Sequence, residues 1–153
     1  MAEDEAAEDK QEDEEEPQRR LVEPISEDDH TLGDKSAPVS IVEFGDYECK
    51  ACRLVHEHVD EVLAERGEEI WFAFRHFPLT NIHPYALGAS LAAEAAHRQQ
   101  KFWEMHGILF ESEGNLEIHE IIGYARDLGL DLGQFAADVA ERDLRRTVLH
   151  RRM

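Results

Sequence analysis

The sequence predicts an α/β fold in which a strand, a helix and a second strand are followed by a purely helical half. The strands are expected over residues 39–45 (VSIVEFG) and 70–77 (IWFAFRHF), because both are short runs of aliphatic and aromatic residues. The first is expected to be buried. Between them, apolar residues recur at helical spacing up to Gly67, which fits a left-handed helix cap. A strand, helix and strand in this order form a right-handed parallel crossover.

The second half, residues 84–150, predicts helices only. Gly129 and Asp131 mark the last helix boundary, as a C-terminal cap followed by an N-cap. The four predicted helices cover residues 85–98, 101–111, 117–128 and 132–149.

The length of the chain indicates one domain. It has 153 residues, and its 42% hydrophobic content is enough for the core of an ordinary small domain. Residues 1–20 hold ten acidic residues against three basic ones and almost nothing that can enter a core. We therefore predict a disordered acidic tail over residues 1–24 and one folded domain over residues 25–153.

The charge of the chain excludes several classes of partner. Acidic residues outnumber basic ones by 35 to 16, which gives a formal net charge of -19. Such a charge repels nucleic acid and anionic membrane surfaces, so neither is expected as a partner. No apolar run approaches the roughly 18 residues that span a bilayer, and the acidic N-terminus is unlike a secretory signal. The sequence therefore predicts a cytoplasmic location and no membrane span.

The two cysteines, Cys49 and Cys52, form a CxxC pair between the first strand and the predicted helix. Unpaired backbone N–H groups at a helix start stabilise a thiolate, so Cys49 is predicted to be the attacking nucleophile. Cys52, almost one turn further on, is predicted to resolve the mixed disulfide. Lys50 adds a positive charge beside the pair, while Asp46 and Glu48 oppose it.

Glu43 is the one acidic residue inside the first strand. A carboxyl buried beneath the cysteine pair would have a raised pKa and could relay a proton to or from Cys52. Alternatively, Glu43 points to solvent from a half-exposed strand. The residues favour neither reading over the other.

A zinc or copper site is the alternative reading of the cysteines. Cys49, Cys52 and His56 could provide three ligands, with His58 or another histidine as the fourth. No second CxxC and no histidine pair at zinc-finger spacing accompany them. The sequence therefore favours redox chemistry, and the histidines are predicted to be ordinary surface residues.

Five segments follow one another along the chain: SAPVSIVEFGDYECKAC, FAFRHFPLTNIHPYA, AAEAA, KFWEMHGILFE and YARDLGLDL. In that order and spacing they resemble the DsbA-like branch of the thioredoxin superfamily, and the resemblance covers roughly residues 28–150. It implies a thioredoxin-like fold with an all-helical insertion after the second strand, disulfide exchange at Cys49 and Cys52 without a cofactor, and a match of Glu43 to the family's acid six residues before the first cysteine. Protein thiols or disulfides and a redox partner are the partners it implies.

The sequence departs from the family pattern in two ways. Lys50 and Ala51 stand between the cysteines, where the family more often has a proline with an aromatic residue or histidine, and this dipeptide tunes thiolate stability. The chain also ends at Met153, before the family's cis-proline loop, closing hairpin and last helix. We therefore expect either a truncated or frameshifted relative, or a chain that pairs its exposed strand edge with a second copy in a homodimer. A catalytically inactive truncated relative is an alternative to the oxidoreductase.

Overall fold

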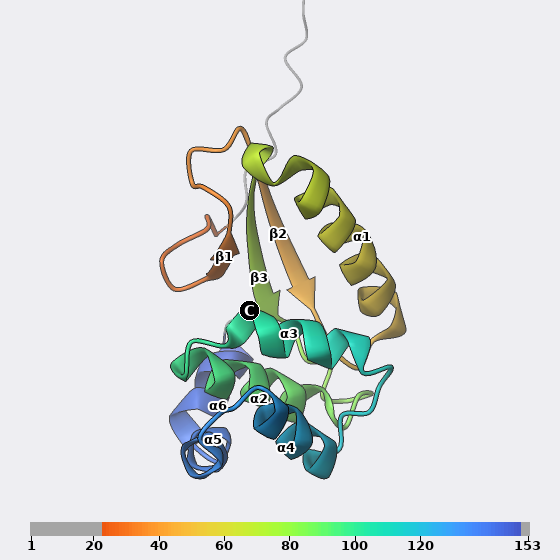
Figure 1. The fold of residues 1–153 in the computed structure, drawn as a ribbon, viewed down its shortest axis with the longest axis vertical. Helices are drawn as coiled ribbons and strands as arrows, with labels where there is room; N and C mark the ends of the chain where they lie inside the picture. Colours follow the sequence, from red (N-terminus) through yellow and green to blue (C-terminus); the bar gives the residue numbers. More distant parts are fainter. Residues whose placement is uncertain (1–22, 151–153) are drawn as a thin grey trace, which may run out of the picture.

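The structure, a computed structural model, describes residues 23–150. The predicted acidic tail, residues 1–24, lies almost entirely outside the described residues. Figure 1 shows two parts, a small sheet flanked by a long helix and a cluster of helices below the carboxyl ends of the parallel strands. The predicted α/β fold is confirmed. No helix in the described residues combines the length and hydrophobicity needed to cross a bilayer.

The sheet has three strands in the order β1-β3-β2, one more than the sequence predicted. Strands β2 (Val39–Gly45) and β3 (Ile70–His76) are parallel, as the crossover requires. The additional strand β1 (His30–Leu32) pairs antiparallel with β3 and places His30 opposite Phe74. Sequence patterns missed β1 because three residues are too few to show an alternation.

Strand β2 is an edge strand, so the prediction that it is buried was wrong. Its residues are mostly partly buried or exposed, and Val39 and Phe44 are 47% and 49% exposed. The central strand is β3, which lies between β1 and β2 and buries six of its seven residues. Both runs have the same apolar composition, and only the strand order in the sheet distinguishes them.

Helix α1 (Lys50–Arg66) follows β2 closely, and Cys49 occupies its N-cap position. The predicted left-handed cap at Gly67 is wrong. Gly67 has φ −56 and ψ −30, which are right-handed helical values, because the chain continues into the short 3-10 helix η1 (Gly67–Glu69) before β3. The later boundary is confirmed. Gly129 has φ 73, and the Asp131 carboxylate accepts a hydrogen bond from the Gln134 N–H at 2.8 Å.

The helical half contains five helices, because the segment predicted as one helix at 132–149 is two. A break at Ala140–Glu141 lets the last helix turn and pack Leu144 and Val148 against Leu87 and Leu91. The other three predicted helices are confirmed. The helices are α2 (Ala86–Arg98), α3 (Phe102–Glu111), α4 (Ile118–Asp127), α5 (Leu132–Val139) and α6 (Arg142–His150).

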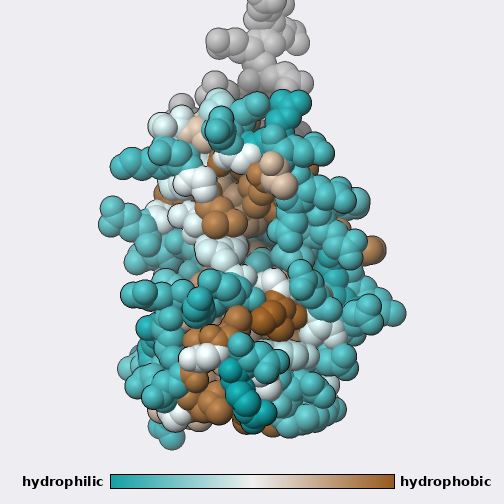
Figure 2. Space-filling view, viewed as in Figure 1, coloured by the Kyte–Doolittle hydropathy of each residue, from teal (hydrophilic) through white to brown (hydrophobic). Residues whose placement is uncertain are grey.

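One hydrophobic core joins the sheet to the helical half. Phe72 and Phe74 of β3 meet Met105 and Leu109 of α3 in it, and the alanines of α2 lie at its centre. Helix α2 buries ten of its thirteen residues, as expected for a helix surrounded by others. Figure 2 shows a mainly hydrophilic surface with brown patches over the strands and over the helical half.

The close approach of β2 to β3 requires a glycine at position 45. A Cβ atom on Gly45 would lie 2.3 Å from the Phe74 ring, whereas a Cβ on Gly88 in α2 would meet nothing within 4 Å. We predict that Gly45→Ala lowers the free energy of unfolding by about 1–3 kcal/mol through overpacking. Gly88→Ala, the matched control, should be neutral or stabilising by about 0.5–1 kcal/mol. Denaturant unfolding measures the free energy of unfolding of both variants. Equal changes in the two would contradict the close contact between position 45 and the Phe74 ring.

Candidate active site

The attacking cysteine predicted from the sequence lies at the start of α1. Cys49 has extended backbone angles (φ −74, ψ 120) and its carbonyl accepts a hydrogen bond from the Arg53 N–H at 3.1 Å. Its side chain makes no capping hydrogen bond to the helix. The sulfur is therefore partly exposed beside the unpaired N–H groups of the first turn, where a thiolate is stabilised.

The second thiol lies against the first. Both cysteines are in the free form, and Cys49 is near enough to raise the pKa of the Cys52 thiol. Burial is the main reason that the pKa of Cys52 is raised to about 11, and the neighbouring Cys49 and the charge of Asp46 raise it further, whereas a hydrogen bond from the Asp46 backbone opposes them. Cys52 is thus a protonated thiol at neutral pH, within reach of the Cys49 sulfur.

Asp46 holds the turn that carries the cysteines. Its side chain is 3% exposed and accepts three hydrogen bonds: from the Glu48 N–H at 2.8 Å, the Leu79 N–H at 2.9 Å and the His83 ring at 2.8 Å. The Cys49 N–H also donates to the Asp46 carbonyl at 3.1 Å. Glu48 accepts from the Tyr85 N–H at 2.8 Å. Both acids therefore fix the turn between β2 and α1 to the loop at 78–85.

Tyr47 anchors the same turn in the core. The side chain is fully buried, and its hydroxyl pairs with Nδ1 of His106 at 2.9 Å. Burial raises the pKa of Tyr47 well above its usual value and lowers the pKa of His106 well below its own, so both groups are neutral. Two residues before Cys49, the backbone is therefore immobilised by packing and by one buried hydrogen bond.

Glu43 lies on the face of β2 that points toward α1. Ile41, two residues earlier, lines the gap beneath this helix, so Glu43 shares its face. Both carboxyl oxygens of Glu43 are buried and have no hydrogen-bond partner among the described residues. Burial, and then the negative charge of Asp60, raise the pKa of Glu43 to about 7. Of the two readings, the structure places a buried, unpaired carboxyl under the cysteine helix rather than a solvated one.

The metal ligands considered in the sequence do not come together. In the described residues, His30, His76 and Glu94 are the only three histidine, cysteine or acidic side chains whose ligand atoms all lie within 4.8 Å of one another. Cys49, Cys52 and His56 do not meet this condition. The ring of His56 stacks on Phe110 instead, and its Nε2 lies 3.3 Å from an Asp60 carboxylate oxygen.

The prediction that the histidines are surface residues was wrong for four of them. His58 is exposed and Lys50 is on the surface, but His30, His56, His76 and His106 are all less than 9% exposed. The only sequence signal for a buried histidine was at position 76, where a histidine ends an apolar strand. The role of Asp46 had a weak signal, since an acid directly after a strand-ending glycine is a common turn former.

Comparison with known proteins decides the family. The protein family described as Thioredoxin matches residues 25–152 of this chain. A thioredoxin-like oxidoreductase from Silicibacter pomeroyi superimposes with a TM-score of 0.73 at 25% identity, over 82% of this chain and 71% of that one. The chain belongs to this thioredoxin family. Alpha-DsbA1 from Wolbachia pipientis has the same fold, with a TM-score of 0.71 at 20% identity over 86% and 68% of the two chains.

Longer relatives contain a segment similar to this chain. Na(+)/H(+) antiporter NhaA 1 from Salinispora arenicola is 44% identical over 123 residues, which is 80% of this chain and 19% of the antiporter. NhaA 1 from Mycolicibacterium gilvum is 42% identical over 133 residues, 86% of this chain and 21% of the antiporter. The chain thus spans about a fifth of the length of these relatives.

The raised pKa of Glu43 predicts a pH-dependent stability. The folded state holds the Glu43 proton more tightly than the unfolded chain, so this contribution to stability is complete below pH 4.5 and is lost as the pH rises through about 7. The side chain of Glu43→Gln stays neutral at every pH. Its free energy of unfolding, relative to that of the unsubstituted protein, should therefore rise by about 1–2 kcal/mol from about pH 5 to about pH 8. This is less than the full pKa shift would give, because solvent screens a part-buried carboxyl.

Denaturant unfolding at both pH values measures this difference. Glu65→Gln is the matched control. Glu65 is an exposed residue of α1, so the difference in stability between this variant and the unsubstituted protein should not change with pH in this way. A constant gap between Glu43→Gln and the unsubstituted protein would contradict the burial of the ionised carboxyl.

Proposed function

We propose that this protein is a thiol-disulfide oxidoreductase that exchanges disulfides with protein or small-molecule thiols through Cys49 and Cys52. One observation carries the proposal: Cys49 is the N-cap residue of a helix that follows a strand, and Cys52 lies in the first turn of that helix, near enough for Cys49 to raise the pKa of its thiol. The DsbA-like fold is consistent with the same chemistry.

The exchange proceeds in two steps. The Cys49 thiolate attacks one sulfur of a substrate disulfide, forming a mixed disulfide and releasing the other substrate sulfur as a thiolate. The Cys52 sulfur then attacks Cys49, and the second substrate thiolate leaves. The protein becomes the oxidised disulfide as the substrate gains two electrons. The same steps in reverse oxidise a dithiol substrate, and a redox partner restores the starting state.

The second step requires removal of a proton from Cys52. Its thiol has a pKa of about 11, so the proton must pass to a base before or during the attack. Glu43 suits this role because its pKa of about 7 leaves a share of the carboxyl ionised near neutral pH. Its buried oxygens have no competing hydrogen bond among the described residues. Lys50, the first residue of α1, is proposed to adjust the stability of the thiolate beside it.

The antiporter relatives do not change this proposal. The chain matches only about a fifth of each one, and the thioredoxin family covers the matching region. Sodium-proton exchange is what those proteins are named for. For this chain we propose disulfide exchange alone.

Substitution of each cysteine separates the two proposed roles. Cys49→Ser should lower disulfide exchange by roughly 100-fold or more, because a hydroxyl is not a nucleophile near neutral pH. Cys52→Ser should retain the first step and accumulate mixed disulfides. Insulin reduction with a thiol donor measures the turnover, and mass spectrometry of the non-reduced protein detects the adduct.

His58→Gln serves as a matched control, since His58 is an exposed residue of the same helix. It should leave turnover unchanged. Unchanged turnover in Cys49→Ser would contradict the proposal. Inactivity of the unsubstituted protein, with a normal fold, would mark it as an inactive relative.

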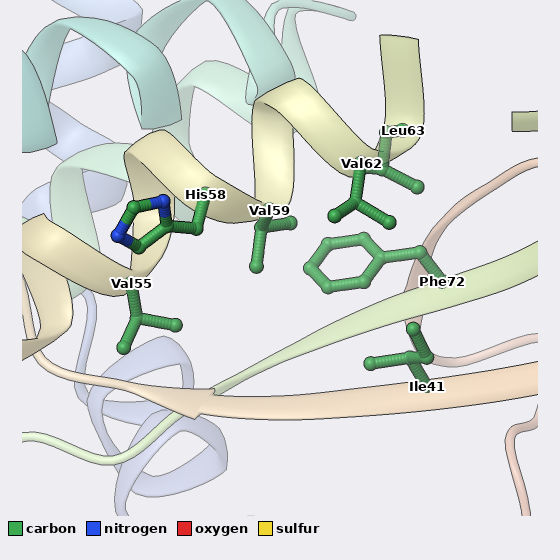
Figure 3. Close-up of a pocket in the computed structure, with 7 residues that line it drawn as sticks. All are labelled: Ile41, Val55, His58, Val59, Val62, Leu63 and Phe72. Carbon is green, nitrogen blue, oxygen red and sulfur yellow. The ribbon is translucent and has the colours of Figure 1, made fainter. Parts of the chain in front are cut away.

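Self-association is a second proposal, which rests on the free edge of β2. In the described residues no strand pairs with the outer side of β2. Beside it lies an apolar groove between α1 and the sheet, in which Val55 and Val62 are 48% and 43% exposed. Figure 3 shows the side chains of α1 facing those of Ile41 and Phe72 across the groove. We propose that a second copy pairs with this edge and covers the groove.

Light scattering across a wide range of concentration measures this association. Val62→Lys, which places a charge in the groove, should shift the protein toward monomer. Ile118→Lys is the matched control, because Ile118 is a 60% exposed apolar residue of α4 outside the groove. A folded monomer at every concentration would rule the second copy out.

A further inference from the structure

Three buried side chains from separate elements converge at the junction of the sheet and the helical half. His30 is in β1, His76 ends β3 and Glu94 is in α2. One Glu94 carboxylate oxygen lies 2.8 Å from Nε2 of His30 and 3.0 Å from Nε2 of His76. The three residues are 7%, 2% and 7% exposed. Two imidazoles and one carboxylate therefore share a small volume from which bulk water is nearly excluded.

The strand register explains why both rings point to the same place. His30 stands opposite Phe74 in the antiparallel pair, so their side chains lie on one face of the sheet. His76 is two residues beyond Phe74 and shares that face. Packing then fixes the rings: His30 stacks on Phe102 with ring centres 3.6 Å apart, and His76 meets Phe74 edge to face at 5.4 Å. The donor nitrogens are thus held in position before any ligand arrives.

Glu94 is the acidic group of this junction. Burial alone would raise the pKa of Glu94, but hydrogen bonds and positive charge from His30 and His76 lower it well below its usual value. An ionised carboxylate inside the protein is compensated by whatever positive charge the two imidazoles carry, or by a cation.

A hollow on the surface adjoins one member of the cluster. A surface hollow of about 340 Å³ lies beside it, and His30 forms part of its wall. The same hollow is lined by His97, Gln100 and Glu104, whose polar groups can hold water. His30 therefore contacts both the buried carboxylate and the hollow.

We propose that His30, His76 and Glu94 bind a divalent metal ion of the zinc class, with water from the hollow as a further ligand. Two imidazole nitrogens, a carboxylate oxygen and a water form a known ligand set for such an ion. Tetrahedral ligands about 2.0–2.1 Å from zinc lie roughly 3.3–3.4 Å apart. The Glu94 oxygen, now 2.8 Å and 3.0 Å from the two ring nitrogens, would therefore move only a short way from each of them, and all three ligand atoms already lie within 4.8 Å of one another.

Each imidazole would bind through Nε2 and carry its proton on Nδ1. The ion would connect two strands to α2 and stabilise the junction. This site shares no ligand with the cysteine pair. The proposed metal binding can therefore be tested independently of the proposed disulfide exchange.

Metal binding is tested in a protein carrying Cys49→Ser and Cys52→Ser, so that the thiols cannot compete for the ion. Titration with Co²⁺, followed by its visible absorption, should show one equivalent bound with nitrogen and oxygen ligands only. Zn²⁺ should displace it. Adding Glu94→Gln should weaken binding by roughly 100-fold, because an amide oxygen is a poor ligand for these ions. His58→Gln is the control and should bind as before.

Two results would overturn the proposal: no stoichiometric binding by the protein with serines at 49 and 52, or binding that Glu94→Gln leaves unchanged. If Glu94→Gln does not fold, nitrogen NMR of the histidine rings in the Glu94-containing protein gives the answer. Zn²⁺ should then move the Nε2 resonances of His30 and His76 and leave those of His58 in place. Unmoved resonances for His30 and His76 would show that the cluster is a hydrogen-bonded network without an ion.

Discussion

The carboxylate of Asp46 is the interaction on which the cysteine site depends. It is almost completely buried and accepts hydrogen bonds from the Glu48 and Leu79 N–H groups and from His83. These bonds connect the end of β2, the turn into α1 and the loop before α2. Because the hydrogen bonds of Asp46 hold the backbone of this turn, Cys49 can occupy the N-cap position without using its own side chain as the cap. The sulfur is left available for chemistry.

The buried acids of this protein fall into two groups. Asp29 pairs with Arg75, Asp138 with Arg98 and Glu94 with two histidines. These carboxylates are compensated, as buried charges in stable proteins are. Glu43 is different, since both of its oxygens are buried without a hydrogen-bond partner among the described residues. An uncompensated carboxyl costs stability, and a raised pKa at such a position is typical of groups that exchange protons in a reaction.

The helical half is joined to the sheet by more than hydrophobic packing. Helix α2 lies at the centre of the core and is built largely of alanine, so neighbouring helices can approach it closely. Its one buried acid, Glu94, faces the sheet and meets histidines from β1 and β3. Polar groups thus specify how the two parts are joined, while the alanines provide the close fit. The link also explains why β1 has a defined place in the sheet despite its length of three residues.

The sequence by itself determined those features that depend on neighbouring residues. The parallel strands, the start of the cysteine helix, three of the helices of the second half and the caps at Gly129 and Asp131 all follow from local periodicity and backbone preference. The CxxC pair and the acid six residues before it predicted disulfide exchange through spacing and resemblance. No distant contact was needed for any of these.

Only the tertiary structure decided what depends on contacts between distant segments. The central position of β3, the exposed edge of β2 and the pairing of β1 are set by strand order, which composition does not encode. Histidines at 30 and 76 appeared to be surface residues because their common partner, Glu94, lies 64 and 18 residues further along the chain. For the same reason Glu43 could be placed only when its strand and α1 were seen to face one another, since burial is a property of the assembled core.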